Sequence, residues 1–422
     1  MLGKIILKEL LTLIPLVMMI FPFLAVRGEV VSYESAESEF SKAEEEVSED
    51  GEEDILKGVW MSQFDMSALY RSGGRQREKS DYTERVFKLI RKIKSEGYNT
   101  LFLQVRPNGD SMYESEIYPN SKYVAGVYGG ETDYDAVGIF VDAARDLGIS
   151  VHAWINPFRL ESREEIEGLD DGERVKELYK KGVAKAGADG LYYLDPSYEE
   201  TVDIIVDGAD EILDKYDFDG IHIDDYFYPT EFELDDEDEF LKSGWADKGE
   251  FRRENISRTV KALYGVCHAH GKIFGVSPAG NIYSLENGWY VDIYEWLSQG
   301  RYVDYVMPQL YFGFKNRVCP FDKILEDWEN AVKNENIKLY IGISAAKCCL
   351  GSEGVADAFA GDGGKYEWRD EKNVIARQIE LVYGGKAKGF CMFSCSSLID
   401  METLEDNVLL SEEKKHFEEL IK

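Results

Sequence analysis

Asp219-Gly220-Ile221-His222-Ile223-Asp224-Asp225-Tyr226-Phe227-Tyr228-Pro229 is the stretch that decides the fold. It is typical of a short strand that ends in two adjacent carboxylates and continues into an aromatic loop. Side chains alternate along a strand, so His222 and Asp224 share one face while two isoleucines share the other. Parallel strands are usually apolar on both faces. The exception is a barrel strand whose carboxyl end opens into an active site. A strand-end turn with two solvated aspartates is the plain alternative.

Similar segments recur along the chain and alternate with helical patterns, which favours the barrel. Besides the opening stretch, strands are expected at 57–62, 99–105, 149–155, 272–277, 303–309, 338–344 and 388–394. Helices are expected at 82–96, 135–147, 195–216, 254–270, 289–299, 321–334, 373–383 and 409–421, the third one capped at Asp195-Pro196-Ser197. Such alternation implies right-handed crossovers and a parallel sheet.

Eight such units predict an α/β fold, a (β/α)₈ TIM barrel with long loops on its C-terminal face. An open, doubly wound sheet is the competing architecture. It is disfavoured because no glycine-rich phosphate turn follows the first strand.

The N-terminal region is expected to lie outside the barrel. Residues 1–28 have a basic start and an uncharged run from 10 to 26, which predicts a secretory signal peptide or an uncleaved anchor. Residues 29–54 are rich in Glu, Asp and Ser and predict a disordered acidic linker. Residues 55–422 would form the catalytic domain, in a protein that is secreted or associated with the cell envelope, outside the cytoplasm.

Composition excludes some partners. The formal charge of −33 argues against nucleic acid and against anionic membrane surfaces, so any membrane contact is expected only through an uncleaved N-terminal segment. The six cysteines are scattered and show no zinc-like spacing, so we expect no metal and no cofactor. The acidic run 231–240 lacks the EF-hand spacing and central glycine, which favours a solvated loop over a calcium site.

Polar and aromatic residues gather where the predicted strands end. Amides and a guanidinium bind hydroxyls, rings stack on sugar faces, and two carboxylates supply proton transfer, so the set suits a polyhydroxylated ligand. The expected catalytic residues are Asp224 and Asp225. The expected substrate-binding residues are Trp60, Gln104, Arg106, Asp110, Trp154, Asn156, His222, Tyr226, Ser277, Gln309 and Tyr311.

Several of these residues also have ordinary structural interpretations. A lone histidine inside a barrel, such as His222, is more often a structural hydrogen bonder. Trp60 and Trp154 are equally suited to packing in the barrel interior. Asp110 is a further candidate for a catalytic carboxylate, and otherwise an acceptor for loop N–H groups. Each of these residues alone is weak evidence for a binding site. They indicate one only because they all lie where predicted strands end.

The chain resembles the glycosyl-hydrolase-like family 10 barrels. The resemblance rests on GVW at 58–60, QVRPNGDSMYES at 104–115, HAWINPFR at 152–159, DGIHIDDYFYP at 219–229, VSP at 276–278 and DYVMPQLY at 304–311. It runs from about Gly58 to Leu398, with the segments in the expected order. It implies an exported bacterial protein that acts as a glycoside hydrolase on glycan strands, with wall glycan lacking its peptides as substrate.

Two mechanisms are open for such an enzyme. A retaining pair needs a nucleophile and an acid about 5 Å apart on either side of the anomeric carbon, which adjacent Asp224 and Asp225 hardly allow. In substrate-assisted catalysis the 2-acetamido group of the sugar attacks instead. Asp224 would then orient that amide, Asp225 would be the acid, and Tyr311 would hydrogen-bond the acetamido oxygen. Close carboxylates also push their pKa values apart, which leaves one protonated near neutrality.

Two other functions remain as alternatives. The usual position of the acid after the fifth strand holds Ser277 rather than Glu, which favours a non-catalytic glycan-binding barrel. An α-glucan hydrolase with Asp224 as covalent nucleophile is the third reading.

Overall fold

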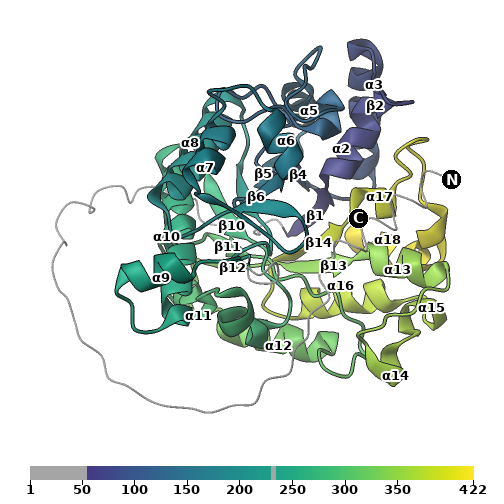
Figure 1. Ribbon diagram of the computed structural model, residues 1–422. Helices are drawn as coiled ribbons and strands as arrows, with labels where there is room; N and C mark the ends of the chain where they lie inside the picture. Colours follow the sequence, from purple (N-terminus) through teal and green to yellow (C-terminus); the bar gives the residue numbers. More distant parts are fainter. Residues whose placement is uncertain (1–54, 230–233) are drawn as a thin grey trace, which may run out of the picture. The chain divides into compact units, whose positions relative to one another are not determined.

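Nine parallel strands form one sheet at the centre of the computed structural model, which describes residues 55–229 and 234–422 (Figure 1). In chain order they are β1 (Leu56–Met61), β4 (Thr100–Arg106), β5 (Ser150–Ile155), β9 (Gly220–Ile223), β10 (Ile273–Val276), β11 (Tyr305–Val306), β12 (Lys338–Leu339), β13 (Ile341–Ser344) and β14 (Gly389–Phe393). Their order in the sheet is β12-β11-β10-β9-β5-β4-β1-β14-β13.

The sheet closes on itself through its seventh strand. β12 and β13 lie at opposite ends of the sheet, yet only Tyr340 separates them in the chain. Tyr340 N donates to Val306 O, and Gly342 N donates to Pro308 O, both at 2.9 Å. The sixth strand, β11, therefore stays hydrogen-bonded to the seventh, which consists of β12 and β13. The nine segments thus occupy the eight strand positions of a barrel. The predicted (β/α)₈ barrel is confirmed.

Helices surround the strands (Figure 1). The eight that match the predicted ones are α3 (Lys79–Ser95), α5 (Ala136–Asp146), α8 (Glu199–Lys215), α10 (Lys248–Ala269), α11 (Ile293–Ser298), α12 (Phe321–Ala331), α16 (Val374–Gly384) and α18 (Ser411–Ile421). The predicted cap of the third helix is wrong. Its N-cap is Tyr198, because Asp195 instead accepts from Ser197 N at 2.9 Å and forms a turn before the helix.

The loops after the strands carry structure that the sequence pattern did not predict. After β5 they form a three-stranded antiparallel sheet in the order β6-β8-β7. The remaining elements are α2 (Gln63–Tyr70), β2 (Arg71–Ser72), β3 (Arg75–Gln76), α4 (Lys122–Ala125), β6 (Arg159–Ser162), α6 (Arg163–Gly168), α7 (Arg174–Lys181), β7 (Ala184–Ala186), β8 (Leu191–Leu194), α9 (Glu237–Ser243), η2 (Ile282–Ser284), η3 (Leu285–Trp289), α13 (Ala345–Ser352), α14 (Gly361–Gly364), α15 (Glu367–Asp370), α17 (Cys395–Leu398) and η4 (Val408–Leu410).

Large rings fill the barrel, and strand glycines make room for them. A Cβ atom on Gly275 would lie 2.0 Å from the ring of Tyr305, and one on Gly342 would lie 2.9 Å from the ring of Trp60. Both distances are too short for a real contact, so only glycine fits at these two strand positions. The interior is therefore a packed core that supports the site above it rather than a channel.

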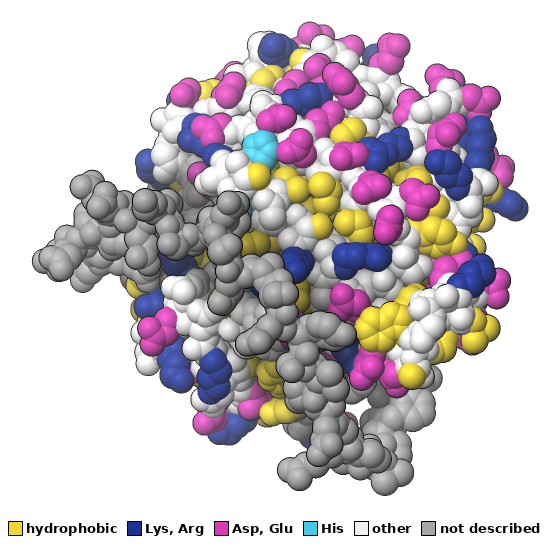
Figure 2. Space-filling view, turned by 90° about the vertical axis from the view of Figure 1, so that its left-hand side faces the viewer, with side chains coloured by type: hydrophobic (Ala, Val, Ile, Leu, Met, Phe, Trp, Pro, Cys, Tyr) yellow, Lys and Arg dark blue, Asp and Glu magenta, His cyan; other side chains and the backbone are white. Residues whose placement is uncertain are grey.

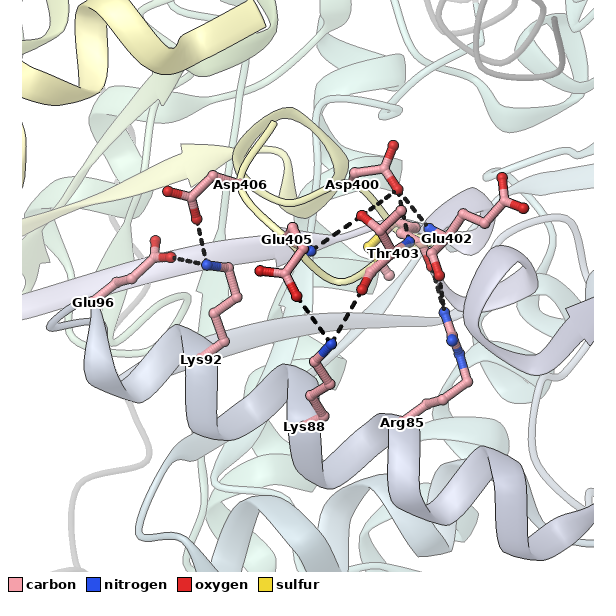
Figure 3. Close-up of polar contacts among 10 residues, drawn as sticks. Arg85, Lys88, Lys92, Glu96, Asp400, Glu402, Thr403, Glu405 and Asp406 are labelled. Atoms are coloured by element: carbon pink, nitrogen blue, oxygen red, sulfur yellow. Dashed lines mark hydrogen bonds and ion pairs between the residues drawn. The ribbon is translucent and has the colours of Figure 1, made fainter. Parts of the chain in front are cut away.

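The first long helix is tied to the last loop of the barrel, as Figure 3 shows. Arg85 of α3 donates to the carbonyl oxygens of Met401 and Glu402 at 2.8 and 2.9 Å. Lys88 donates to Thr403 O and to the Glu405 carboxylate, each at 3.2 Å. These contacts join residues more than three hundred positions apart and hold the two ends of the barrel chain together.

The N-terminal predictions stay untested. The signal peptide or anchor at 1–28 and the linker at 29–54 lie outside the described residues. Within the described part of the chain, no helix is long and apolar enough to cross a membrane. On the face shown in Figure 2, the acidic and basic side chains of the described residues are intermingled and form no patch of a single charge.

Candidate active site

Asp224 and Asp225, here called the acid pair, directly follow β9 at the carboxyl end of the barrel. Asp224 is 5% exposed and receives two donors from β5 and the residue after it. Trp154 Nε1 donates to it at 3.1 Å, and the Asn156 amide nitrogen lies 2.7 Å from each of its carboxylate oxygens. The neighbouring strand thus fixes the orientation of this carboxylate.

A chain of amides fixes the donor itself. The backbone N–H of Gln63 donates to Gln104 Oε1 at 2.8 Å, and Gln104 Nε2 donates to Asn156 Oδ1 at 2.6 Å. Asn156 must therefore turn its NH₂ group toward Asp224. The start of α2, which is capped by Ser62, sets the direction of the whole relay.

Asp225 has a more open position than Asp224, because its side chain is partly exposed. The Gln309 side chain hydrogen-bonds to it. Gln309 is itself held by a bond from Nε2 to the carbonyl oxygen of Ser277, at 3.0 Å. Ser277 is fully buried and its hydroxyl donates to Met307 O at 2.7 Å, so the structure places it under Gln309 rather than on the rim.

Burial raises the pKa of both carboxyl groups of the acid pair. The pKa of Asp224 rises to about 7, first through desolvation and then through the charge of Asp225. Desolvation raises the pKa of Asp225 to about 6, against the hydrogen bond from Gln309. The two adjacent carboxyl groups titrate together and hold one proton at about pH 6 to 7, and this proton belongs to the pair rather than to either residue. One acid and one carboxylate side by side is what proton transfer with charge stabilisation requires.

Aromatic rings border the acid pair on the side of strands β11 and β14. Tyr311 stacks on Phe393 with ring centroids 5.5 Å apart and meets Trp60 edge-on at 6.5 Å. Burial raises the pKa of the Tyr311 hydroxyl well above its usual value, and the charges of both aspartates add to this. Tyr311 thus stays a hydrogen-bond donor beside the acid pair, as its expected role demands.

His222 and Trp60 lie below the mouth. Trp60 Nε1 donates to His222 Nε2 at 3.1 Å, so the ring proton of His222 is on Nδ1, where it faces the Tyr305 hydroxyl at 3.0 Å. That hydroxyl lies 3.3 Å from His152 Nδ1. Burial lowers the pKa of His222 well below its usual value and that of His152 to about 4. Both ring nitrogens of His222 are occupied within the barrel, which leaves none for a sugar hydroxyl.

Arg106 and Asp110 are not brought to the acid pair. A β-bulge between Gln104 and Arg106 pairs Arg106 with Ile155, so it points out of the barrel. There its Nη1 meets the Tyr118 hydroxyl at 2.5 Å. Asp110 is fully buried in the following loop, where its carboxylate accepts from Asn108 N at 2.8 Å. Burial raises its pKa to about 6.

Arg159 lies at the mouth although the sequence reasoning did not select it. Its guanidinium stacks over Tyr226, with Cζ 4.1 Å from the ring centroid, and Tyr226 N lies 3.4 Å from Asp224 Oδ1. The positive charge of Arg159 lowers the pKa of both members of the acid pair against the effect of burial. The sequence feature that could have identified Arg159 is its position as the last residue of HAWINPFR, four residues after the end of β5.

The acidic run after the site is partly described. Residues 231–233 lie outside the described residues. In the remainder, Asp236 is buried and accepts from Arg252 Nε and Nη2 at 2.6 and 2.7 Å. Asp235, Glu237 and Asp238 are exposed, so the expectation of a solvated loop fails at Asp236 but holds for these three residues. Among the described residues no cluster of three His, Cys, Asp or Glu is arranged to hold a metal ion.

Two surface hollows lie apart from the acid pair. One of about 600 Å³ is lined by residues of α7 and the start of α8, and the other of about 290 Å³ by the loop around Tyr118 and Tyr128. Neither is lined by Asp224 or Asp225. We place the site at the mouth because the polar network and the shifted carboxyl groups are there.

Comparisons with known proteins agree with this architecture. Two solved structures share the fold at low sequence identity. One is the catalytic domain of a β-amylase from Paenibacillus polymyxa, with TM-score 0.51 and 10% identity, covering 87% of this chain and 99% of that one. The other is the glycoside hydrolase domain of PgaB (BpsB) from Bordetella bronchiseptica, with TM-score 0.51 and 13% identity, covering 83% and 97%.

Sequence comparison is more specific. The chain is 29% identical over 321 residues to the glycosyl hydrolase YngK of Bacillus subtilis (strain 168), covering 70% of this chain and 61% of that protein. It is 29% identical over 329 residues to the glycosyl hydrolase DigH of Escherichia coli (strain K12), covering 69% and 73%. The model of the family described as Glycosyl hydrolase-like 10 matches residues 55–356. The resemblance is thus confirmed, and the chain belongs to the Glycosyl hydrolase-like 10 family.

Proposed function

We propose that this protein is a glycoside hydrolase that cleaves N-acetylhexosamine-containing glycan of the bacterial wall, acting on strands without peptides. We further propose that it does so outside the cytoplasm, exported or anchored through residues 1–28. Family membership and the names of its relatives support hydrolysis of glycosidic bonds. The acid pair supports the choice of a sugar that carries an acetamido group.

The observation that carries this choice is the different setting of two adjacent carboxylates. Asp224 is buried and held by Trp154 and Asn156, which leaves it little freedom to move toward a sugar carbon. Asp225 is partly exposed, as a group that protonates a leaving oxygen must be. A fixed carboxylate beside a partly exposed acid suits a reaction in which the substrate supplies the nucleophile.

The reaction then proceeds in two steps. The acetamido oxygen attacks the anomeric carbon, the glycosidic C–O bond breaks, and the leaving oxygen takes the proton of Asp225. Asp224 faces the amide N–H and stabilises the positive charge of the cyclic oxazolinium that results, while Tyr311 donates to the acetamido oxygen. Asp225, now a carboxylate, takes a proton from water, which attacks the anomeric carbon, opens the ring and gives a product of retained configuration.

The test uses peptide-free wall glycan and counts new reducing ends. Wild-type protein is expected to release them, and Asp225→Asn to lower the rate by about 10²-fold or more, because the general acid is lost. Asp171→Asn is the matched control, since that side chain is 83% exposed and lies outside the site. If Asp225→Asn cleaves as fast as the wild type, the assignment of the acid is wrong.

The same assay separates the two alternatives. A non-catalytic glycan-binding barrel would bind the glycan without new reducing ends, and the buried Ser277 beyond β10 is the observation that favours it. An α-glucan hydrolase with Asp224 as nucleophile would cleave an α-glucan that has no acetamido group. The proposed enzyme would leave that α-glucan intact.

A further inference from the structure

Arg159 is a buried cation that has no partner anion among the described residues. Its side chain is 6% exposed, and its Nε has no hydrogen-bond partner. Across residues 55–229 and 234–422, no carboxylate lies within the 4.0 Å that would make an ion pair with it. A buried charge of this kind is costly unless something pairs with it. The Tyr226 ring lies against one face of the guanidinium, with its centroid 4.1 Å from Cζ, and the Nε on the edge of the guanidinium has no partner in the part of the chain that the structure describes.

The backbone around Arg159 is held in place. Arg159 begins β6, where it pairs with Tyr193 of β8. Gly109, at φ 61°, lies against the next residue of β6, and a Cβ on it would come within 2.2 Å of Leu160 Cδ2. Glycine is therefore required for the loop after β4 to support this strand. The backbone is thus held by strand pairing, and the guanidinium by its burial and its contact with Tyr226.

The hydrolytic step explains this cation only in part, because its charge favours the ionised form of Asp224 that the reaction needs. A general acid at neutral pH benefits from a raised pKa, and a positive charge nearby opposes that. Arg159 also does not form an ion pair with Asp224 or Asp225, so it is not their counterion in contact. A planar guanidinium pairs well with a carboxylate through two parallel hydrogen bonds, and a ligand would have to supply that carboxylate.

We propose that Arg159 binds a carboxylate on the sugar beside the scissile bond, which makes the site selective for acidic N-acetylhexosamine glycans. This rests on the proposed function and names its substrate more closely. Two sugars would supply the group, namely a muramic acid through its lactyl carboxylate and a uronic acid through its C6 carboxylate. Both present the same anion to the arginine fork.

The experiment compares four glycans by kcat/KM and by equilibrium binding. They are peptide-free wall glycan, the same glycan with its carboxyl groups reduced to alcohols, a glycan alternating N-acetylglucosamine with glucuronic acid, and neutral chitin oligosaccharides. Each is tested with the wild type, with Arg159→Gln and with Arg159→Lys. Arg163→Gln is the control, because it removes the same charge four residues away at a side chain that is 68% exposed.

We expect the wild type to prefer wall glycan over its carboxyl-reduced form by about tenfold or more, the range of a charge-assisted pair. Arg159→Gln should bring the ratio of kcat/KM on wall glycan to kcat/KM on its carboxyl-reduced form to about one, whatever its absolute rates, and Arg159→Lys should keep part of the preference. Preference for the uronic acid glycan instead would identify the C6 carboxylate. Equal binding of both wall glycans by the wild type would overturn the proposal even if both are cleaved, whereas failure to bind or cleave any glycan would overturn the proposed function as well.

Discussion

At the scale of single residues, the two aspartates differ because their neighbours differ. Asp224 meets an indole N–H and an amide whose direction is set from the start of α2. Asp225 meets Gln309 and solvent. Adjacent positions in the sequence thus acquire separate roles, one in orientation and one in proton transfer.

The plot of kcat/KM against pH should be bell-shaped. With pKa values of about 7 and about 6 for the acid pair, the singly protonated state is most populated between these values. Below this interval both groups are protonated and charge stabilisation is lost. Above it both are ionised and the proton for the leaving group is missing. A kcat/KM profile from pH 4 to 9 checks this, and a plateau that persists at pH 9 would contradict it.

Asn156→Ala should weaken catalysis and shift one limb of that profile. The hydrogen bond from Asn156 lowers the pKa of Asp224, so its removal raises that pKa and moves the acid limb, where Asp224 becomes protonated, to higher pH. We expect kcat/KM to fall by about tenfold or more, the size of one lost hydrogen bond to a charged group. Asn336→Ala, at an exposed loop position, is the control and should behave as the wild type. An unmoved acid limb would argue against the amide relay.

At the scale of elements, the spacing of apolar residues and the alternation of strand and helix patterns predict the barrel well. They do not predict the direction of every side chain. The strands and helices appear within a few residues of the expected bounds, because apolar spacing along each one reflects burial. Arg106 was misplaced because a bulge shifts the strand by one residue, and nothing in QVRPNGD marks it. Arg159 was missed because the small sheet that carries it is built from segments distant in sequence.

Strand glycines offer a test of the packed interior. Gly275→Ala would place a methyl group 2.0 Å from the Tyr305 ring, and overpacking of this kind costs about 1–3 kcal/mol. Gly265→Ala is the matched control in α10, where a Cβ meets nothing within 4 Å, and it should stabilise the protein by about 0.5–1 kcal/mol. Urea unfolding measures both free energies. Equal stability of the two variants would mean that the barrel interior is looser than described.

At the scale of the whole molecule, the barrel depends on joining its first and last units. β1 pairs with β14, and side chains of α3 hydrogen-bond to the loop before α18. The site is built from both halves of the chain, since Asn156 comes from the first half and Gln309 and Tyr311 from the second. Loss of this closure would therefore affect the site as well as stability.

Arg85→Ala should test the closure. It removes two hydrogen bonds to the carbonyl oxygens of Met401 and Glu402, and we expect a loss of about 1–2 kcal/mol in the free energy of unfolding. Lys88→Ala on the same helix is the control. Its side chain is 54% exposed, so its ion pair with Glu405 should contribute less than about 0.5 kcal/mol. If both variants lose equally little stability, the contacts of Figure 3 do not hold the ends together.

The most direct measurement of the central claim is the rate of cleavage of one glycan before and after removal of its N-acetyl groups. If the acetamido oxygen is the nucleophile and the acid pair serves it, N-deacetylation should lower kcat/KM by about 10²-fold or more with the wild-type protein. An undiminished rate on the deacetylated glycan would contradict substrate assistance and leave Asp224 as the nucleophile.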